Sequence, residues 1–251
     1  MNYKDRINKE MLPHHIAVIM DGNGRWAKKL GKPRIFGHRN GVKSVRQTTE
    51  AAAEMGIDYL TLYAFSTENW GRPKPEVNAL MRLLVQTMKS EIKTLMDNEI
   101  RLMAIGDIDQ LPSQTLKSLR EGIETTAGNT RMTLTLALNY SSRWDITRAM
   151  KQIAGKVASG ELAEAEIDQE TISRHLSTHY MPDPELLVRT SGEYRISNYL
   201  LWEISYAELY FTDVHWPDFD KEQLYKAIYE FQNRERRFGK TGEQMLKEVK
   251  V

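Results

Sequence analysis

Residues 18–26 read Val18-Ile19-Met20-Asp21-Gly22-Asn23-Gly24-Arg25-Trp26. An apolar run that ends in a glycine-rich turn is typical of a buried strand followed by the N-terminus of a helix. Such a turn binds phosphates, because backbone N–H groups and the helix dipole point at the anion. The carboxylate of Asp21 would repel a phosphate there unless a divalent cation lay between them. The segment therefore predicts a strand, a turn and a helix that together bind a diphosphate with Mg²⁺ at Asp21.

The same turn has three other interpretations. Gly22-x-Gly24-x-x-Ala27 fits a dinucleotide fingerprint, but that fingerprint needs an acidic residue at the end of the second strand, where residues 64–66 have none. A metal-dependent phosphatase needs a second carboxylate beside Asp21, and position 23 is Asn. A glycine turn with a capping Asp and no ligand is the third. The residues favour the interpretation as a metal and diphosphate site.

Short apolar runs alternate with longer amphipathic stretches along the whole chain. The predicted strands span 16–20, 59–64, 100–105, 132–138, 186–188 and 209–211, and the predicted helices include 42–52, 76–98, 114–127, 144–158, 169–176 and 221–236. This alternation predicts an α/β fold with a parallel sheet and helices on both faces. No repeat or linker interrupts it, so we expect one domain over residues 1–251, with a flexible N-terminus at 1–14 and a tail at 240–251.

The composition excludes several classes of protein. A net charge of +1 argues against a general nucleic-acid binder. Because the chain has no cysteine, disulfides and thiolate metal sites are excluded. No window reaches the roughly 18 apolar residues of a membrane span, and residues 1–12 lack a signal-peptide core. We expect a cytoplasmic protein, with transient membrane contact if it handles a lipid.

The segments that follow the predicted strands are polar, glycine-rich or arginine-bearing. In parallel α/β sheets ligands bind beyond the carboxyl ends of the strands, so these segments predict one shared site. Arginines suit phosphate oxygens, and those in or near the predicted edge are Arg25, Arg34, Arg39, Arg72, Arg189 and Arg195. The segment 65–75 is too long for a tight turn and is either a binding loop or an irregular surface loop.

Two helical features have open interpretations. The helix over residues 76–98 has apolar residues beyond one stripe, which is typical of a buried helix or of one that lines a channel. His175-x-x-x-His179 has the spacing of a zinc pair, but it lacks the metalloprotease Glu and a third ligand. We therefore interpret the two histidines as the end of a surface helix.

Five blocks of the chain resemble the motifs of the cis-prenyltransferases, and most closely those of the bacterial branch that makes undecaprenyl diphosphate. The blocks are residues 15–27, Gly37-His38-Arg39-x-Gly41, residues 65–73, residues 189–199, and residues 207–219 with the closing Arg234-x-Arg236-Arg237-Phe238-Gly239. They follow one another from residue 15 to residue 239, which is essentially the whole chain.

The resemblance implies a single α/β domain with a central six-stranded, mostly parallel sheet flanked by helices, and a homodimer. A hydrophobic tunnel would lie beside the sheet, partly walled by the helix that begins near Glu76. The implied activity is the Mg²⁺-dependent, sequential condensation of isopentenyl diphosphate onto farnesyl diphosphate with cis geometry. The product would be undecaprenyl diphosphate, a lipid-carrier precursor for cell-wall polysaccharides. The alternative is a non-catalytic partner subunit, but such subunits tend to lose residues equivalent to Asp21 and Arg25.

The same resemblance implies roles for individual residues. Asp21 would coordinate Mg²⁺, with Glu208 near the metal and helped by the dimer partner. The residues that would bind the allylic substrate are Gly22, Asn23, Gly24, Arg25, Trp26, Arg34 and His38. Those that would bind the diphosphate of isopentenyl diphosphate are Arg189, Arg195 and Ser197. Ser66, Asn69, Trp70 and Arg72 would form a mobile loop over that substrate, with Asn69 near the departing proton.

Two further points concern the edges of these motifs. The family pattern Asn-Tyr-Gly-Gly-Arg reads Asn139-Tyr140-Ser141-Ser142-Arg143 here, and serine lacks the freedom of glycine at positive φ, so this turn is expected to differ slightly. The segment Arg237-x-Gly239 is expected to reach across the dimer to the same site.

Overall fold

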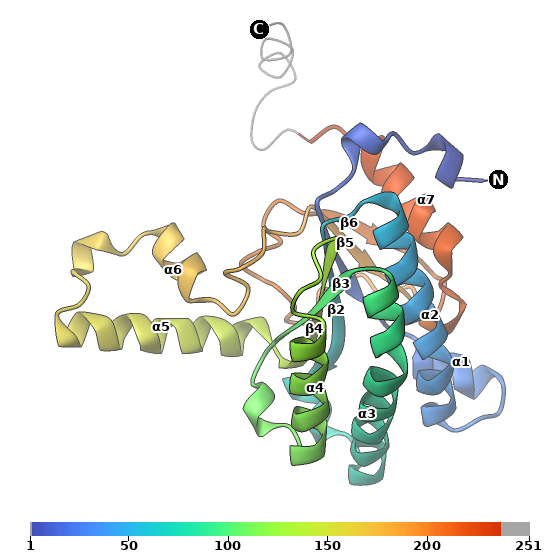
Figure 1. The fold of residues 1–251 in the computed structure, drawn as a ribbon, viewed down its shortest axis with the longest axis horizontal. Helices are drawn as coiled ribbons and strands as arrows, with labels where there is room; N and C mark the ends of the chain where they lie inside the picture. The colour runs from blue at the N-terminus through green and yellow to red at the C-terminus, as the bar shows by residue number, and fades with distance from the viewer. Residues whose placement is uncertain (1, 237–251) are drawn as a thin grey trace, which may run out of the picture.

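A six-stranded parallel sheet forms the centre of the computed structural model, which describes residues 2–236 (Figure 1). The strand order is β3-β4-β2-β1-β5-β6, and every neighbouring pair is parallel. The strands are β1 (His15–Ile19), β2 (Tyr59–Ser66), β3 (Ile100–Ile105), β4 (Met132–Tyr140), β5 (Leu186–Arg189) and β6 (Glu208–Phe211). The predicted single α/β domain and its strands are confirmed.

Seven α-helices lie among the described residues. They are α1 (Asn23–Lys29), α2 (Arg34–Met55), α3 (Lys74–Asp97), α4 (Ser113–Thr125), α5 (Ser142–Ser159), α6 (Gln169–His175) and α7 (Lys221–Gln232). Short 3₁₀ turns occur at Lys4–Arg6, Lys9–Met11, Thr67–Gly71, Ile108–Gln110, Glu164–Glu166 and Trp216–Asp218. Helix α7 ends at Gln232, before the predicted residue 236, because the polar run after it has no apolar side chain to bury. No helix in residues 2–236 is long and apolar enough to cross a membrane.

The two faces of the sheet are covered differently. Ile16 and Val18 of β1 point to the face that carries α2, α3, α4 and α7, where most of the core lies. Ala17 and Ile19 point to the other face, where the irregular segment 196–207 packs through Tyr199 and its neighbours. Helices α5 and α6 pack on each other and project from the body (Figure 1). The sheet is thus flanked by helices as predicted, but an irregular segment takes their place on one face.

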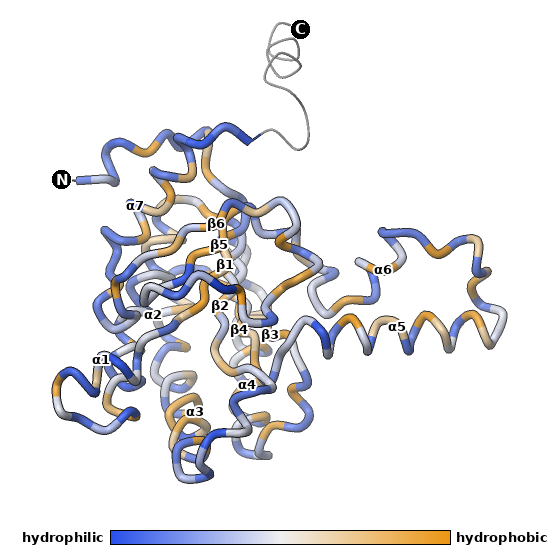
Figure 2. The backbone as a smooth tube through the Cα atoms, turned by 180° about the vertical axis from the view of Figure 1, so that it is seen from behind, coloured by the Kyte–Doolittle hydropathy of each residue, from blue (hydrophilic) through white to orange (hydrophobic). Residues whose placement is uncertain are grey.

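Hydrophobic residues converge on the strands, whereas α5 alternates between hydrophobic and hydrophilic positions along its length (Figure 2). The N-terminal residues lie on α7, where the rings of Tyr3 and Tyr229 are 5.7 Å apart and the backbone N–H of Asn8 donates to Gln232 Oε1 at 3.1 Å. These contacts hold the chain ahead of β1 on the same side as α7.

Candidate active site

The turn after β1 has the predicted strand, turn and helix arrangement. Strand β1 ends at Ile19, and Gly22 precedes α1 with a φ of 99°, in the left-handed region. A Cβ atom on Gly22 would lie 2.5 Å from Ser191 Oγ and 2.8 Å from His215 Nδ1. Both the conformation and the space therefore require glycine at this position.

Asp21 is held as an anion in this turn. Its Oδ1 accepts the Gly22 N–H at 2.6 Å and lies 3.2 Å from Arg25 Nη2, while its Oδ2 accepts from Arg189 Nη2 at 2.9 Å. Burial alone would raise the pKa of the Asp21 carboxyl, but the Arg189 hydrogen bond, the Gly22 N–H and the charge of Arg25 together lower it. About a third of the side chain (31%) is exposed, so a ligand can reach the ionised carboxylate.

A second group of charged residues comes from the end of β5 and the segment that follows it. Arg189, the last residue of β5, is buried and donates to Ser197 Oγ at 2.7 Å and to the backbone oxygen of Arg195. Its Nε is buried without a partner among residues 2–236. Glu193 joins Arg25, at 2.6 Å, to Arg195. A buried, unpaired guanidinium N–H beside several cations is suited to an anionic ligand.

A third group lies where α2 and α3 begin. The guanidinium of Arg34 packs on Gly24, since a Cβ there would lie 2.5 Å from Arg34 Nη1. Glu76 Oε1 is 3.2 Å from Arg34 Nε and 3.4 Å from Arg72 Nη1, so it pairs with both cations where the two helices begin. This carboxylate links the two helices.

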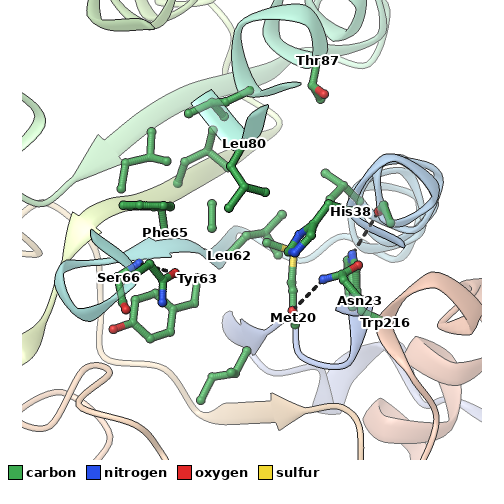
Figure 3. Close-up of a pocket in the computed structure, with 18 of the residues that line it drawn as sticks. Met20, Asn23, His38, Leu62, Tyr63, Phe65, Ser66, Leu80, Thr87 and Trp216 are labelled. Atoms are coloured by element: carbon green, nitrogen blue, oxygen red, sulfur yellow. Dashed lines mark hydrogen bonds between the residues drawn. The ribbon is translucent and has the colours of Figure 1, made fainter. Parts of the chain in front are cut away.

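His38 reaches from α2 towards Met20 at the end of β1 (Figure 3). Its Nε2 is buried and has no hydrogen-bond partner in the described part of the chain. Burial and the nearby charges of Arg72 and Arg34 lower the pKa of His38 to about 4. The ring is therefore neutral at pH 7, with a nitrogen available to a ligand.

The segment 65–75, predicted as a binding loop or an irregular surface loop, contains a 3₁₀ turn over residues 67–71. The Ser66 N–H donates to Asn69 Oδ1 at 3.2 Å, and Trp70 Nε1 donates to Asn139 Oδ1 at 2.7 Å. The ring of Trp70 meets that of Phe65 edge-on at 5.1 Å. Asn69 and Ser66 line a cavity at this edge of the sheet, whereas Trp70 does not.

One cavity of about 850 Å³ runs from these charged groups into the apolar layer beneath α2 and α3. Figure 3 shows some of the residues that line it, among them His38 and Leu80. Its charged end is lined by Asp21, Asn23, His38, Arg72, Arg189, Arg195 and Ser197. Its apolar length is lined by Val42, Val45, Leu80, Leu84, Met88, Leu134 and Leu136. The helix predicted over residues 76–98 is therefore buried on one side and also forms a wall of this cavity.

Some residues expected at the site lie elsewhere. Trp26 donates to Asp218 at 2.9 Å and stacks on Phe36, outside the cavity lining. Glu208 begins β6 beside Leu186, three residues or roughly 10 Å before the end of that strand, and its carboxylate accepts from Arg234 at 2.9 Å. Within one chain the structure does not bring Glu208 to Asp21. The segment Arg237-x-Gly239 lies outside the described residues.

Several contacts at the site were missed by the sequence reasoning. Thr190 Oγ1 accepts the Asp21 N–H at 2.9 Å and donates to its carbonyl at 2.7 Å, which holds β1 and β5 together at the site. Glu193 and Glu76 each join two arginines. The many arginines in these loops indicate that carboxylates must lie near them. They do not indicate which carboxylates these are.

Two side points are settled by local geometry. Ser141 is extended, with φ −152°, and Ser142 begins α5, so neither residue needs the left-handed region. Ser142 Oγ accepts the Leu201 N–H at 2.9 Å.

His175 and His179 each form a hydrogen bond through Nδ1 with a carbonyl of their own segment, at 2.7 and 3.0 Å. No group of three His, Asp or Glu within residues 2–236 is arranged to hold a metal.

Known proteins match this chain over nearly its whole length. A family model described as "Putative undecaprenyl diphosphate synthase" matches residues 19–239. The chain belongs to the undecaprenyl diphosphate synthase family. An isoprenyl transferase of Chlorobaculum tepidum is 54% identical over 94% of this chain and 89% of its own length. The ditrans,polycis-undecaprenyl-diphosphate synthase ((2E,6E)-farnesyl-diphosphate specific) of Escherichia coli K12 is 53% identical over 90% of each chain.

Two solved structures that resemble this chain share its fold. Lavandulyl diphosphate synthase from Lavandula x intermedia, in complex with dimethylallyl diphosphate, is 36% identical, with a TM-score of 0.90 over 92% of this chain and 100% of its own. A probable undecaprenyl diphosphate synthase from Campylobacter jejuni is 34% identical, with a TM-score of 0.76 over 91% of this chain and 99% of its own. The cis-prenyltransferase resemblance and the six-stranded architecture are therefore confirmed.

Proposed function

We propose that this protein condenses isopentenyl diphosphate units sequentially onto farnesyl diphosphate, with cis geometry, to give undecaprenyl diphosphate, a lipid-carrier precursor for cell-wall polysaccharides. The main observation behind the proposal is one cavity with two different parts. Asp21 and arginines line one end of it, and mostly apolar side chains line the rest. A diphosphate with a growing prenyl chain has the same two parts. The name of the Escherichia coli relative supports the choice of farnesyl diphosphate as starter.

The allylic diphosphate binds at the turn after β1 in this proposal. Its ligands are the backbone and side chains of residues 22–25, with Arg34 and neutral His38, and the N-terminus of α1 adds partial positive charge. The diphosphate of isopentenyl diphosphate binds to Arg189, Arg195 and Ser197, where Arg189 Nε lacks another partner in the described chain. Ser66, Asn69, Trp70 and Arg72 orient this second substrate.

The residues present fit Mg²⁺. Mg²⁺ in proteins is commonly held by one or two carboxylates together with substrate phosphates, and Asp21 is one ionised, partly exposed carboxylate beside two diphosphate sites. When bound, the ion neutralises charge on the leaving diphosphate. A role for Glu208 at the metal requires a second copy of the chain, because in its own chain it pairs with Arg234 at the other end of the sheet.

The chain's own groups carry out the rest of the chemistry. The bond between the allylic carbon and the diphosphate oxygen breaks, and the arginines stabilise the developing anion without reorganisation. The double bond of isopentenyl diphosphate attacks the allylic carbon, a new carbon–carbon bond forms, and a proton leaves near Asn69, with the departed diphosphate as its acceptor. The apolar walls take up the lengthened tail and exclude water from the cation.

We further propose a homodimer that acts in the cytoplasm and touches the membrane when its lipid product leaves. Strand β6 pairs on one side only among the described strands, and α5 and α6 project from the body. The open edge of the sheet and the projecting pair of helices support a second copy as partner. No role for nucleic acid is proposed.

Sizing the products of the purified protein tests the function. We expect long products that grow by isopentenyl units when farnesyl diphosphate, isopentenyl diphosphate and Mg²⁺ are supplied, and none when Mg²⁺ is chelated. Absence of any product from the purified protein would instead favour a non-catalytic partner subunit. A parallel reaction with dimethylallyl diphosphate alone tests whether the protein forms a short product, as the name of the lavender relative suggests for that enzyme.

A further inference from the structure

Arg46 on α2 and Glu91 on α3 form a charged pair in the apolar part of the cavity. Arg46 Nε donates to Glu91 Oε2 at 2.7 Å and Arg46 Nη2 to Oε1 at 2.5 Å, so both carboxylate oxygens are held by one guanidinium. Both residues line the cavity. The Glu91 side chain is only 12% exposed, whereas that of Arg46 is 48% exposed. The Glu91 carboxylate is thus mostly buried in the cavity wall, and the Arg46 side chain lies between it and the solvent.

The pair lies far from the charged end. Helices α2 and α3 both begin at that end, where Arg34 and Glu76 are 3.2 Å apart. Glu91 follows Glu76 by fifteen residues on one helix, which corresponds to roughly 22 Å at 1.5 Å per residue. The two helices are therefore tied near the reacting groups and again deep along the cavity.

The wall between these two ties is mostly apolar. Val42 and Val45 of α2 face the same cavity as Leu80 and Leu84 of α3. Around Glu91 the character changes, since Thr87 and Thr94 lie one turn before and after it and also line the cavity. A polar strip that crosses an apolar wall is costly to bury unless each group is paired, and the Arg46 fork supplies the pairing.

We propose that Arg46 and Glu91 form a clasp that closes the cavity between α2 and α3 and so sets the longest prenyl chain it accommodates. This inference rests on the proposed function. An ion pair in which the arginine is half-exposed contributes only a modest free energy, so this contact between the helices can open. When the clasp opens, α3 moves away from α2 and a longer chain can pass between the two helices. A merely structural tie would change stability but leave product length unaltered.

Product length in matched variants tests the clasp. Arg46→Met and Glu91→Gln each break the pair, and the double variant Arg46→Glu/Glu91→Arg restores it in reverse. Lys93→Met is the control, because it breaks the exposed Lys93–Asp97 pair on the same helix, outside the cavity lining. Arg46→Lys keeps the charge but loses the fork, so it supplies a milder variant if the others fail to fold.

We expect the fraction of products longer than the main wild-type product to rise by roughly threefold or more in both single variants, the scale of one ion pair. The reversed pair returns it towards the wild-type value, and the control leaves it unchanged. The rate of the first condensation, measured in a single turnover, stays at the wild-type value in all variants, because the clasp is remote from the reacting groups.

The failures of the two proposals are distinguishable. If the wild type elongates farnesyl diphosphate but the folded single variants give wild-type or shorter products, the clasp proposal is overturned and the proposed function stands. If the control lengthens products as the single variants do, the clasp proposal is also overturned. If the wild type forms no prenyl product, the proposed function fails and the clasp proposal with it.

Discussion

The buried guanidinium of Arg189 donates to the carboxylate of Asp21 at 2.9 Å, which joins the end of β5 to the turn after β1. Ser197 Oγ and the backbone oxygen of Arg195 hold the other side of the same guanidinium, so its orientation is fixed. The two residues stand on neighbouring strands, yet 168 positions separate them in the chain. This contact keeps Asp21 ionised and places it between the two proposed diphosphate sites.

Replacement of Asp21 tests the centre of the proposal. We expect Asp21→Ala to fold but to lose roughly 10² to 10³-fold in kcat, the scale for one key electrostatic group. Asp21→Asn should lose a similar amount, because it keeps the shape and removes the charge. The measurement is turnover of labelled isopentenyl diphosphate, with the exposed Asp97→Asn as control. Near-wild-type turnover by either Asp21 variant would refute the assignment.

Gly24→Ala tests the site at the start of α2. The new Cβ would lie 2.5 Å from Arg34 Nη1, and the half-exposed Arg34 side chain would swing away rather than unfold the helix. Loss of that cation should raise the KM for farnesyl diphosphate roughly tenfold, the scale of a hydrogen bond to a charged group. The control is Gly155→Ala on α5, where nothing lies within 4 Å of the new atom. An unchanged KM would remove Arg34 from the proposed diphosphate ligands.

The strands were predictable because runs of buried apolar residues mark them, and β3 was placed at its observed ends. The path of the segment after β5 could not be predicted from the sequence, because it depends on non-glycine residues at positive φ, among them Ser191 and Ser197. The turn around Asp21 predicts that this residue belongs to the site. The sequence does not predict the same for Glu76, because the residue it pairs with, Arg34, lies 42 positions away in the chain. The predicted strand over residues 209–211 already places Glu208 at the amino end of a parallel strand, away from the carboxyl edge, and its role at the metal comes from the family resemblance alone.

The neutral His38 makes stability depend on pH. Its pKa in the folded chain is about 4, against 6.5 ordinarily, so between these values the unfolded chain binds a proton that the folded one does not. Stability therefore falls as pH falls through this window, with a slope approaching about 1.4 kcal/mol per pH unit for this group. Glu203 acts in the opposite sense, because burial raises its pKa to about 7.

The comparison of His38→Gln with the wild type isolates the contribution of His38, because Glu203 acts equally in both. The free energy of unfolding, measured in urea from about pH 7 to about pH 5, should decline less in the variant. The difference arises because glutamine takes up no proton in either state. Parallel declines in the two proteins would show that the imidazole is not held neutral.

Leu84→Trp tests whether the apolar cavity holds the growing chain. Leu84 lines the cavity from α3, and an indole there fills space that a lengthening chain would otherwise occupy. We expect shorter main products and an unchanged rate for the first condensation, because the reacting end is not obstructed. Met96→Trp, on the same helix but 40% exposed and outside the lining, is the matched control. If Leu84→Trp and Met96→Trp both give the wild-type product lengths, the chain takes another path, and the cavity beneath α3 is not its tunnel.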